Sequence, residues 1–280
     1  MRVPPISAIL DGQDAEGYWL KPGSGYGPKY TGTVWSLMFL DQMGAEPRDR
    51  RIQRACTYVL GHTQAPGGGF GWLPRNSGVV HCLNGNLLRA MIDFGRLGDR
   101  AVRDSIDWQA RSITGEGFDD YFRWATAGLG FRCGINGTEP CAWGAIKALR
   151  GLAAIPPRRR TRPVGEAIAE GVAFLLSRDP AIADYPTDTK VSSTWFKLGF
   201  PSGYMADVLQ NLEVLTELGK AKDRRLDRAL ELVLAKQDAQ GRWRNEYPYR
   251  GKLWSDVERP RERSKWVTLR ACAVVKAALG

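Results

Sequence analysis

The stretch "KQDAQGRW", Lys236 to Trp243, repeats the pattern of "GQDAEGYW", Gly12 to Trp19, near the other end of the chain. Both read Gln-x-x-x-Gly-x-Trp. Two further glutamines begin incomplete copies of this pattern. Gln64 is followed by Gly68 and Phe70, and Gln109 is followed by Gly117 and Phe118. A Gln side chain can bind backbone groups left open at a helix end, and a Trp can stack beside it while its N–H finds an acceptor. We predict that each segment follows a helix and joins neighbouring repeats.

Helices in pairs surround these segments. Apolar residues recur at helical spacing along most of the chain, and almost nothing reads as a strand. Gly44, Gly95 and Gly219 each end one helix of a pair, where a left-handed cap is favoured. A longer segment rich in Gly and aromatic residues follows each pair. This recurring unit indicates an all-helical repeat protein.

Length and composition limit the class of protein. The 280 residues, 43% of them hydrophobic, can bury a core as one domain, 1–280. No apolar run approaches the roughly 18 residues of a membrane span, and the first residues lack the apolar core of a signal peptide. We therefore expect a soluble, cytoplasmic protein. The net charge of +10 favours anionic partners, but no nucleic-acid-binding module accompanies it. Contact with a membrane surface and the oligomeric state stay open.

The helix before Gln64 carries a resemblance to a known superfamily. The residues concerned are Arg54, Ala55, Tyr58, Val59, Leu60 and Gln64, with Gly68 after them. They resemble the extended QW repeat of squalene-hopene and oxidosqualene cyclases. The chain is therefore similar to members of the terpenoid cyclase and protein prenyltransferase superfamily.

The resemblance implies an alpha/alpha toroid, in which an inner ring of parallel helices surrounds a central cavity and an outer ring runs the other way. The expected inner helices are 34–43, 82–95, 141–153, 204–219 and 265–279. The expected outer elements are an amino-terminal stub, 47–63, 98–111, 164–178 and 222–237. These make five hairpins, whereas six are usual in the superfamily. We expect the stub to pack on the last helix and close the ring.

The resemblance also implies an enzyme, a cyclase or transferase acting on an isoprenoid substrate, with or without a diphosphate. The Asp-x-Asp-Asp acid of class II cyclases is absent. The candidate catalytic residues are Asp119 and Asp120, of which one would stay protonated beside the other if both were buried, and Asp207. The alternatives are that the adjacent pair caps a helix in a solvated loop and that Asp207 only complements a helix dipole.

Aromatic residues of the loops are candidates for holding an isoprenoid chain or stabilising a carbocation, and they are Trp72, Trp124, Trp143, Trp195, Phe196 and Trp254. Stacking between repeats explains the same residues. A diphosphate would need cations, and Arg89 and Lys147 on inner helices are the candidates. Their alternative place is the surface at the far end of the ring.

Cysteines suggest a metal site. Cys82 and Cys141 fall at the start of successive inner helices, and Cys133 lies on the loop that enters the second. With His81 or Asp207 as the fourth group, they would bind one zinc ion. The alternative is that the thiols are apolar packing residues and His81 is a cap. Two other functions therefore stay open, namely a zinc enzyme that modifies a peptide or thiol, and a non-catalytic binding toroid with a filled lumen.

Overall fold

The computed structural model describes residues 3–118, 127–187, 190–258 and 262–280. In these ranges the regular structure is helical, and extended pairing is confined to isolated bridges. The α-helices are α1 (Ile6–Asp11), α2 (Thr33–Gln42), α3 (Arg50–His62), α4 (His81–Asp93), α5 (Arg100–Thr114), α6 (Ala142–Ala153), α7 (Arg162–Leu176), α8 (Val208–Glu217), α9 (Asp227–Leu234) and α10 (Lys265–Leu279). None of these described helices is long and apolar enough to cross a membrane.

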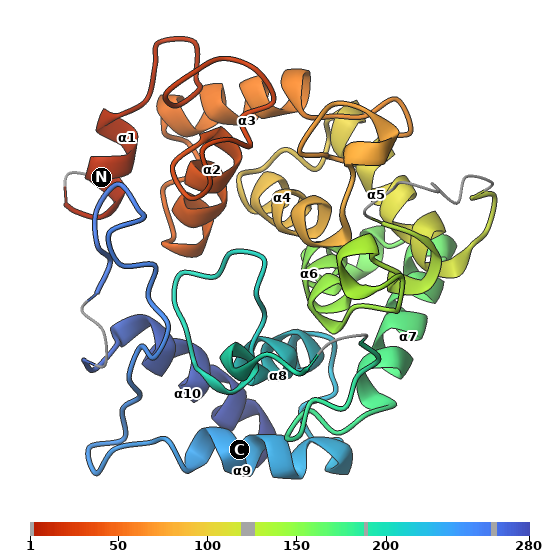
Figure 1. Cartoon of the computed structure of the whole chain (residues 1–280), viewed down its shortest axis with the longest axis vertical. Helices are drawn as coiled ribbons and strands as arrows, with labels where there is room; N and C mark the ends of the chain where they lie inside the picture. The colour runs from red at the N-terminus through yellow and green to blue at the C-terminus, as the bar shows by residue number, and fades with distance from the viewer. Residues whose placement is uncertain (1–2, 119–126, 188–189, 259–261) are drawn as a thin grey trace.

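The helices form two rings (Figure 1). α2, α4, α6, α8 and α10 lie around the middle, and each packs on the next along this series. α3, α5, α7 and α9 lie outside them, each against the inner helix that precedes it in the same hairpin. The predicted alpha/alpha toroid is confirmed, with inner and outer helices close to the expected ranges.

The ends of the ring meet through a loop. α1 packs on α2, and the gap between α2 and α10 is spanned by the segment that precedes α10 (Figure 1). The Trp254 indole N–H lies 3.1 Å from both the Thr31 carbonyl oxygen and the Ser36 hydroxyl. Its ring lies against Gly12, where a Cβ would approach a ring carbon to 2.6 Å. Trp254 therefore closes the ring, instead of the predicted contact between the stub and the last helix.

Two helix boundaries differ from the predictions. α5 continues to Thr114, so Gln109 lies inside this helix and is fully buried. The prediction that Gln109 marks a junction after the helix is wrong. α8 begins at Val208 instead of 204, because the Asp207 carboxylate accepts the Gln210 N–H and caps the helix there.

The first two Gln segments join neighbouring hairpins as predicted. The Gln13 side-chain amide donates to Gly17 O in its own loop and, at 2.9 Å, to Arg51 O in the first turn of α3. Gln64 repeats this arrangement, with bonds of 2.9 Å to Gly68 O and 2.8 Å to Ala101 O in α5. Each glutamine thus donates to carbonyl groups on both sides of a junction.

The Trp of each complete segment is buried at the same kind of junction. The Trp19 indole donates to Ile9 O at 2.6 Å, and its backbone N–H donates to the Thr33 hydroxyl at the start of α2. The Trp243 indole donates in the same way to Val233 O at 2.7 Å, and its backbone N–H to a hydroxyl of α10.

The glycine of the pattern has a steric cause. Gly17 has φ +102° and Gly68 has φ +103°, a region that residues with a Cβ rarely adopt. At each site a Cβ would lie 2.7 Å from a backbone oxygen of the adjoining outer helix, Arg54 O in α3 or Asp104 O in α5. The loop therefore passes too close to the helix for any side chain.

Candidate functional site

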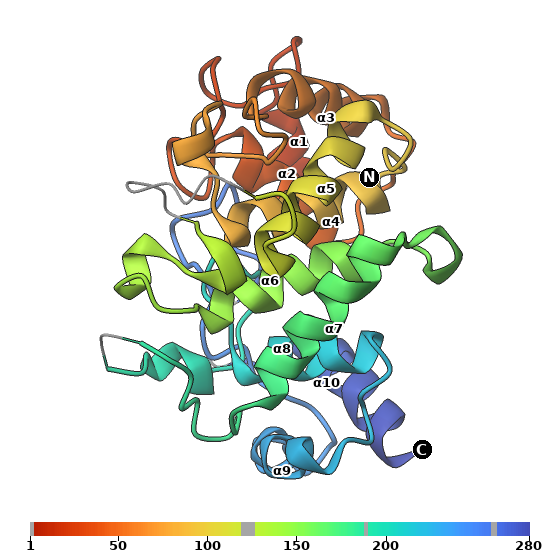
Figure 2. The same cartoon turned by 90° about the vertical axis from the view of Figure 1, so that its right-hand side faces the viewer.

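A cavity opens at one mouth of the ring, where the inner helices begin. The loops that lead into α4, α6 and α8 collect on the same side of the molecule (Figure 2). The cavity measures about 280 Å³. We call it the thiol cavity, and its described lining residues are Val80, Cys82, Cys133, Ile135, Asn136, Cys141, Ala142, Trp143, Ala183, Tyr185, Pro186, Thr187, Lys190, Val191, Ser192, Trp195 and Tyr204.

Close packing of α4 on α6 brings the helix starts to this mouth. A Cβ at Gly85 of α4 would lie 2.1 Å from the Lys147 carbonyl oxygen of α6, so only glycine permits the approach. Gly151 of α6 would likewise place a Cβ 2.8 Å from Gly85 O. Cys82, one residue into α4, and Cys141, the residue before α6, consequently line the same cavity.

A short backbone ladder places the third thiol. Arg132 pairs with Pro140 in an antiparallel bridge, and the Cys141 N–H donates to Phe131 O at 2.9 Å. The Cys133 N–H donates to Glu139 O at 3.2 Å on the other side of the bridge. Residues 133 and 141 therefore share one face of the ladder, because side chains alternate along each strand. The three cysteines therefore line one cavity at this mouth.

The three thiols have different acidities. A hydrogen bond from the Cys141 thiol lowers the pKa of Cys133 to about 6, against the effect of burial, and the backbone N–H groups of Ile135 and Asn136 add to this. The same bond, together with burial, raises the pKa of Cys141 well above its usual value. Burial raises the pKa of Cys82 to about 12. Cys133 is thus the thiol most easily ionised in the cavity.

His81 does not join the thiols. Its Nε2 lies 2.9 Å from Gly128 O, and its Nδ1 lies 2.9 Å from the Gln109 side-chain amide. The ring is buried, and burial lowers the pKa of His81 to about 4. His81 is therefore a neutral structural residue, and its contact with the buried Gln109 links α4 to α5.

Asp207 does not supply a fourth ligand either. Its two carboxylate oxygens accept the Gln210 N–H at 2.8 Å and the Gly199 N–H at 3.1 Å. Within the described ranges, no three His, Cys, Asp or Glu side chains are arranged to hold a metal ion. The predicted zinc ion therefore lacks even a set of three protein ligands among the described residues, and zinc binding stays a prediction.

Two of the six predicted aromatic residues line the thiol cavity, namely Trp143 and Trp195. The Trp195 indole also donates to Pro180 O at 2.8 Å, so this ring is fixed in place. Sequence reasoning missed Tyr185 and Tyr204, which line the same cavity. Both lie in segments rich in Gly, Pro and aromatic residues, and that composition was the available signal.

Other predicted residues lie elsewhere. Asp119, Asp120 and Trp124 fall outside the described residues. Trp72 and Phe196 pack against the hydrophobic core without lining the thiol cavity, and Trp254 closes the ring.

Arg89 does not point a free charge at the thiol cavity. Its guanidinium binds the Asp93 carboxylate one turn along α4 and the Glu217 carboxylate of α8 at 2.8 Å. Among the described lining residues of the cavity, the charged one is instead Lys190, which is exposed.

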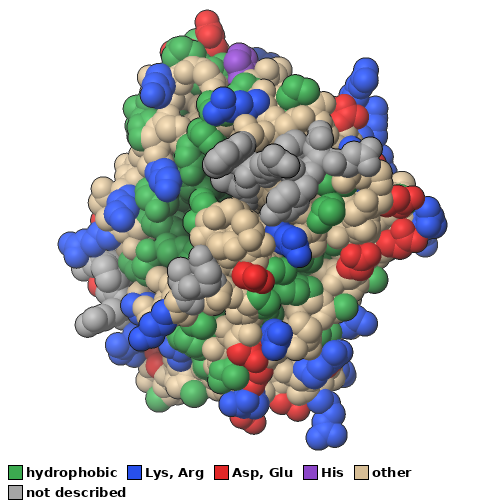
Figure 3. Space-filling model, turned by 45° about the vertical axis from the view of Figure 1, so that its right-hand side comes forward, with side chains coloured by type: hydrophobic (Ala, Val, Ile, Leu, Met, Phe, Trp, Pro, Cys, Tyr) green, Lys and Arg blue, Asp and Glu red, His purple; other side chains and the backbone are tan. Residues whose placement is uncertain are grey.

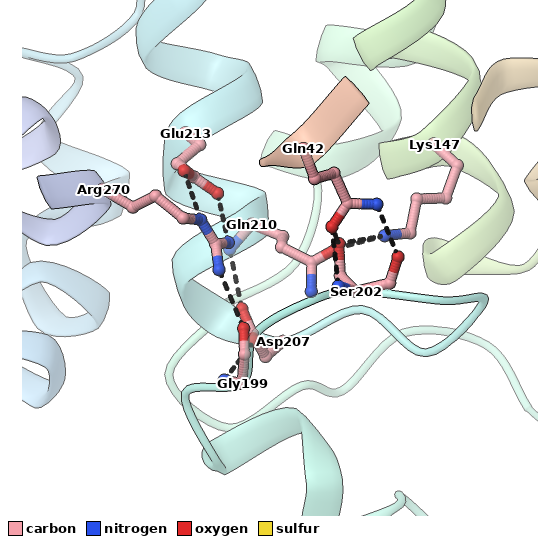
Figure 4. Close-up of polar contacts among 8 residues, drawn as sticks. All are labelled: Gln42, Lys147, Gly199, Ser202, Asp207, Gln210, Glu213 and Arg270. Atoms are coloured by element: carbon pink, nitrogen blue, oxygen red, sulfur yellow. Dashed lines mark hydrogen bonds and ion pairs between the residues drawn. The ribbon is translucent and has the colours of Figure 1, made fainter. Parts of the chain in front are cut away.

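The lumen is occupied by polar side chains (Figure 4). We call this group the lumen cluster, and it comprises Gln42, Lys147, Gly199, Ser202, Asp207, Gln210, Glu213 and Arg270. Lys147 is fully buried, and its ammonium group donates to the Ser202 hydroxyl at 3.3 Å and to the Gln210 amide oxygen. The space beside the cluster is only about 10 Å³. The open central cavity expected from the sequence is therefore filled at this level.

A larger groove of about 900 Å³ lies on the outer surface beside α3, lined among others by Glu16, Arg54 and His62. It is far less enclosed than the thiol cavity, and none of the predicted site residues lines it. His62 stacks on Tyr58 there, with ring centroids 4.0 Å apart, and its Nδ1 lies 2.8 Å from Tyr58 O.

Lys147 makes the stability of the fold depend on pH. Burial and the Arg150 charge lower the pKa of Lys147 to about 7, although Asp207 and Cys82 act in the opposite direction. The unfolded chain, with an ordinary lysine pKa near 10.4, then binds more protons than the folded chain between these values. The contribution of Lys147 to stability is therefore least favourable below pH 7 and improves as the pH rises toward 10.

As the pH rises from 7 to 9, we expect the free energy of unfolding of the native protein to increase relative to that of the Lys147→Met variant. The slope should approach about 1.4 kcal/mol per pH unit. Urea unfolding at three pH values measures it, with the exposed Lys220→Met as the matched control. A difference that is independent of pH would show that Lys147 is charged throughout this range.

Comparisons with known proteins do not identify a family for this chain. The fold and site define an alpha/alpha toroid with an aromatic and thiol-lined cavity at one mouth. No family model matches the sequence, and no curated protein matches it. Solved structures of similar shape include a protein from Actinoplanes, with 14% identity, a TM-score of 0.34, and coverage of 98% of this chain and 97% of that chain.

Two further solved structures are of enzymes of different kinds. A glycosidase has 13% identity and a TM-score of 0.41, with coverage of 97% of this chain and 94% of that one. The type II terpene cyclase MstE from Scytonema has 12% identity and a TM-score of 0.34, with coverage of 97% and 96%. These likenesses are distant, so the fold assignment rests on the helices themselves.

Proposed function

We propose that this protein is an enzyme that binds an isoprenoid-class small molecule in the thiol cavity. The observation that carries the proposal is the wall of that cavity, in which Trp143, Trp195, Tyr185 and Tyr204 surround an apolar space. Ligand sites are typically concave, mainly apolar and aromatic, with a few polar groups at one end. The thiol cavity has this composition.

The size and charge of the thiol cavity restrict the class of ligand that it can bind. The cavity volume of about 280 Å³ lies just below the roughly 300–1,000 Å³ of small-molecule pockets, which suits a short prenyl chain. Lys190 and Ser192 line the cavity as well, and Lys190 is exposed, so an anionic head group can remain partly in water beside it. Figure 3 shows hydrophobic side chains gathered in a band on one face, with Lys and Arg side chains frequent at its edges.

A non-catalytic binding toroid is the second candidate, and the filled lumen favours it. Asp207, the described acid among the predicted catalytic residues, lies in the lumen cluster and is held by two backbone N–H groups. It does not line the thiol cavity. The two candidates differ in turnover, since both require ligand binding at the same place.

Calorimetric titration with geranyl diphosphate, farnesyl diphosphate and farnesol tests the binding site. We expect Trp143→Ala to weaken all three ligands about tenfold, because one aromatic contact is worth about 0.5–1.5 kcal/mol beyond its buried area. Lys190→Ala should weaken only the diphosphates. Trp72→Ala and Lys220→Ala are the matched controls, since Trp72 is also half-buried, Lys220 is also exposed, and neither lines the cavity.

Two results would contradict the proposal. Equal weakening by Trp143→Ala and Trp72→Ala would place the ligand elsewhere, and the absence of saturable binding for all three compounds would remove the isoprenoid class. Product analysis by mass spectrometry after incubation with each compound then separates the candidates. Binding without conversion would identify the protein as a binding module.

A further inference from the structure

We propose that Cys133 and Cys141 are a redox-active thiol pair in the wall of the thiol cavity, which closes to an intramolecular disulfide on reaction with a small-molecule disulfide. The inference does not depend on the identity of the cavity ligand. It rests on the backbone ladder, which places both thiols on one face, and on their access to the cavity.

The ladder places the two thiols on the same side. Both residues lie on one face of the antiparallel pairing around Arg132 and Pro140, and both line the thiol cavity. A disulfide of 2.03–2.05 Å usually joins Cα atoms 4.4–6.8 Å apart, a separation typical of residues near each other on one face of paired strands. Side-chain rotation can therefore close the bond while the ladder is kept, and the bond would link the two ends of the 133–141 segment.

The surroundings assign different roles to the two thiols. Cys133 lies directly before the short 3-10 turn Gly134–Asn136, and the Cys141 thiol and the N–H groups of Ile135 and Asn136 lower its pKa. Hydrogen-bond donors directed at a sulfur stabilise its thiolate, which is the nucleophilic form. Cys133 is therefore the attacking thiol, and Cys141 is the resolving thiol.

Both thiols are reachable through the cavity. Cys133 and Cys141 are half-buried and line a space large enough for a small reagent. Cys82 lines the same space and is a competing partner, whereas Cys56 is buried in α3 and Cys272 is exposed on α10. Among the five cysteines, Cys133 and Cys141 thus form the proposed pair, Cys82 is the competing partner, and Cys56 and Cys272 serve as internal references.

The reaction balances as two exchange steps. The Cys133 thiolate attacks one sulfur of oxidised glutathione, which forms a mixed disulfide and releases one glutathione thiolate. Cys141 then loses its proton to that thiolate or to water and attacks the Cys133 sulfur, which releases the second glutathione. The protein loses two hydrogen atoms, and one glutathione disulfide becomes two thiols.

Peptide mapping of the Cys272→Ser variant, treated with oxidised glutathione in the presence of a chelator, tests the proposal. We expect a peptide cross-linked between Cys133 and Cys141, and an intact mass lower by two hydrogens. In the additional Cys141→Ser variant, mixed disulfide should accumulate on Cys133. The Cys133→Ser variant should lose the cross-link without accumulating mixed disulfide on Cys141, and Cys82→Ser should leave the cross-link unchanged.

Three outcomes would overturn it. A cross-link from Cys82 to Cys133 or Cys141 would show that Cys133 and Cys141 are not the reactive pair. Mixed disulfide on Cys141 in the Cys133→Ser variant, at the rate seen for Cys133, would remove the assigned roles. Persistence of free thiols at both positions, under conditions in which the exposed Cys272 of the native protein is fully modified, would show that they are packing residues.

Discussion

Replacing Trp243 by Ala is expected to lower the free energy of unfolding by about 3–5 kcal/mol. The side chain is 1% exposed, and its indole donates to Val233 O at the end of α9. Its backbone N–H also reaches the Thr268 hydroxyl of α10, so the residue ties an outer helix to the next inner helix. Urea unfolding followed by circular dichroism measures the loss.

Trp19→Ala should have a similar effect, because its contacts with Ile9 O and Thr33 repeat those of Trp243. Trp243→Phe separates packing from hydrogen bonding, and it should cost less than Trp243→Ala. The half-buried Trp72 is the matched control, since it lies outside the repeated segments. If neither Trp19→Ala nor Trp243→Ala moves the unfolding midpoint, these segments do not hold the ring together.

The helices could be predicted because their signals are local. Apolar spacing and the glycines after α2, α4 and α8 mark the elements, and Gly44, Gly95 and Gly219 indeed have positive φ in the structure. The meeting of Cys82 with Cys141 also followed from topology, because successive parallel helices begin at the same mouth. Gly85 and Gly151 make that approach especially close.

The contents of the lumen depend on contacts that no local pattern reveals. Ser202 lies on a loop that enters the lumen. Its backbone N–H donates to the Gln42 side-chain oxygen at 2.7 Å, although 160 positions separate the two residues. Lys147 was correctly placed on an inner helix, but its partners Ser202 and Gln210 come from this distant part of the chain. The side-chain direction of His81 was equally unpredictable, since Gln109 and the loop around residue 128 fix it.

Arg270→Ala is expected to lower the free energy of unfolding by about 2–4 kcal/mol. The Arg270 guanidinium donates to the Glu213 carboxylate at 2.7 Å and to Gly199 O at 2.8 Å, and so joins α10 to α8 and to the loop that fills the lumen. Removing one partner of a buried pair typically costs about 3–5 kcal/mol, and the value here should be smaller because the side chains are 16% and 24% exposed.

The loss should depend on pH. Burial alone would raise the pKa of Glu213, but the charge and hydrogen bonds of Arg270, with Arg150, hold this pKa below its usual value. A carboxylate with a depressed folded pKa stabilises the fold above its unfolded pKa of about 4.3, and this stabilisation disappears as the pH falls through the folded pKa. The difference between native protein and Arg270→Ala should therefore be largest near neutral pH and smaller at pH 4.

A double variant and an exposed pair complete the test. Arg270→Met with Glu213→Leu should recover part of the lost stability, because neither buried charge is then left without its partner. Arg228→Ala, which breaks the exposed ion pair with Asp179, should change the free energy of unfolding by no more than about 1 kcal/mol. A loss at Arg270 that equals the loss at Arg228, at both pH values, would show that the ion pair in the lumen contributes nothing beyond a surface contact. The loop at Gly199 would then be held in the lumen by packing and by its other hydrogen bonds, among them those with Gln42, Lys147 and Asp207.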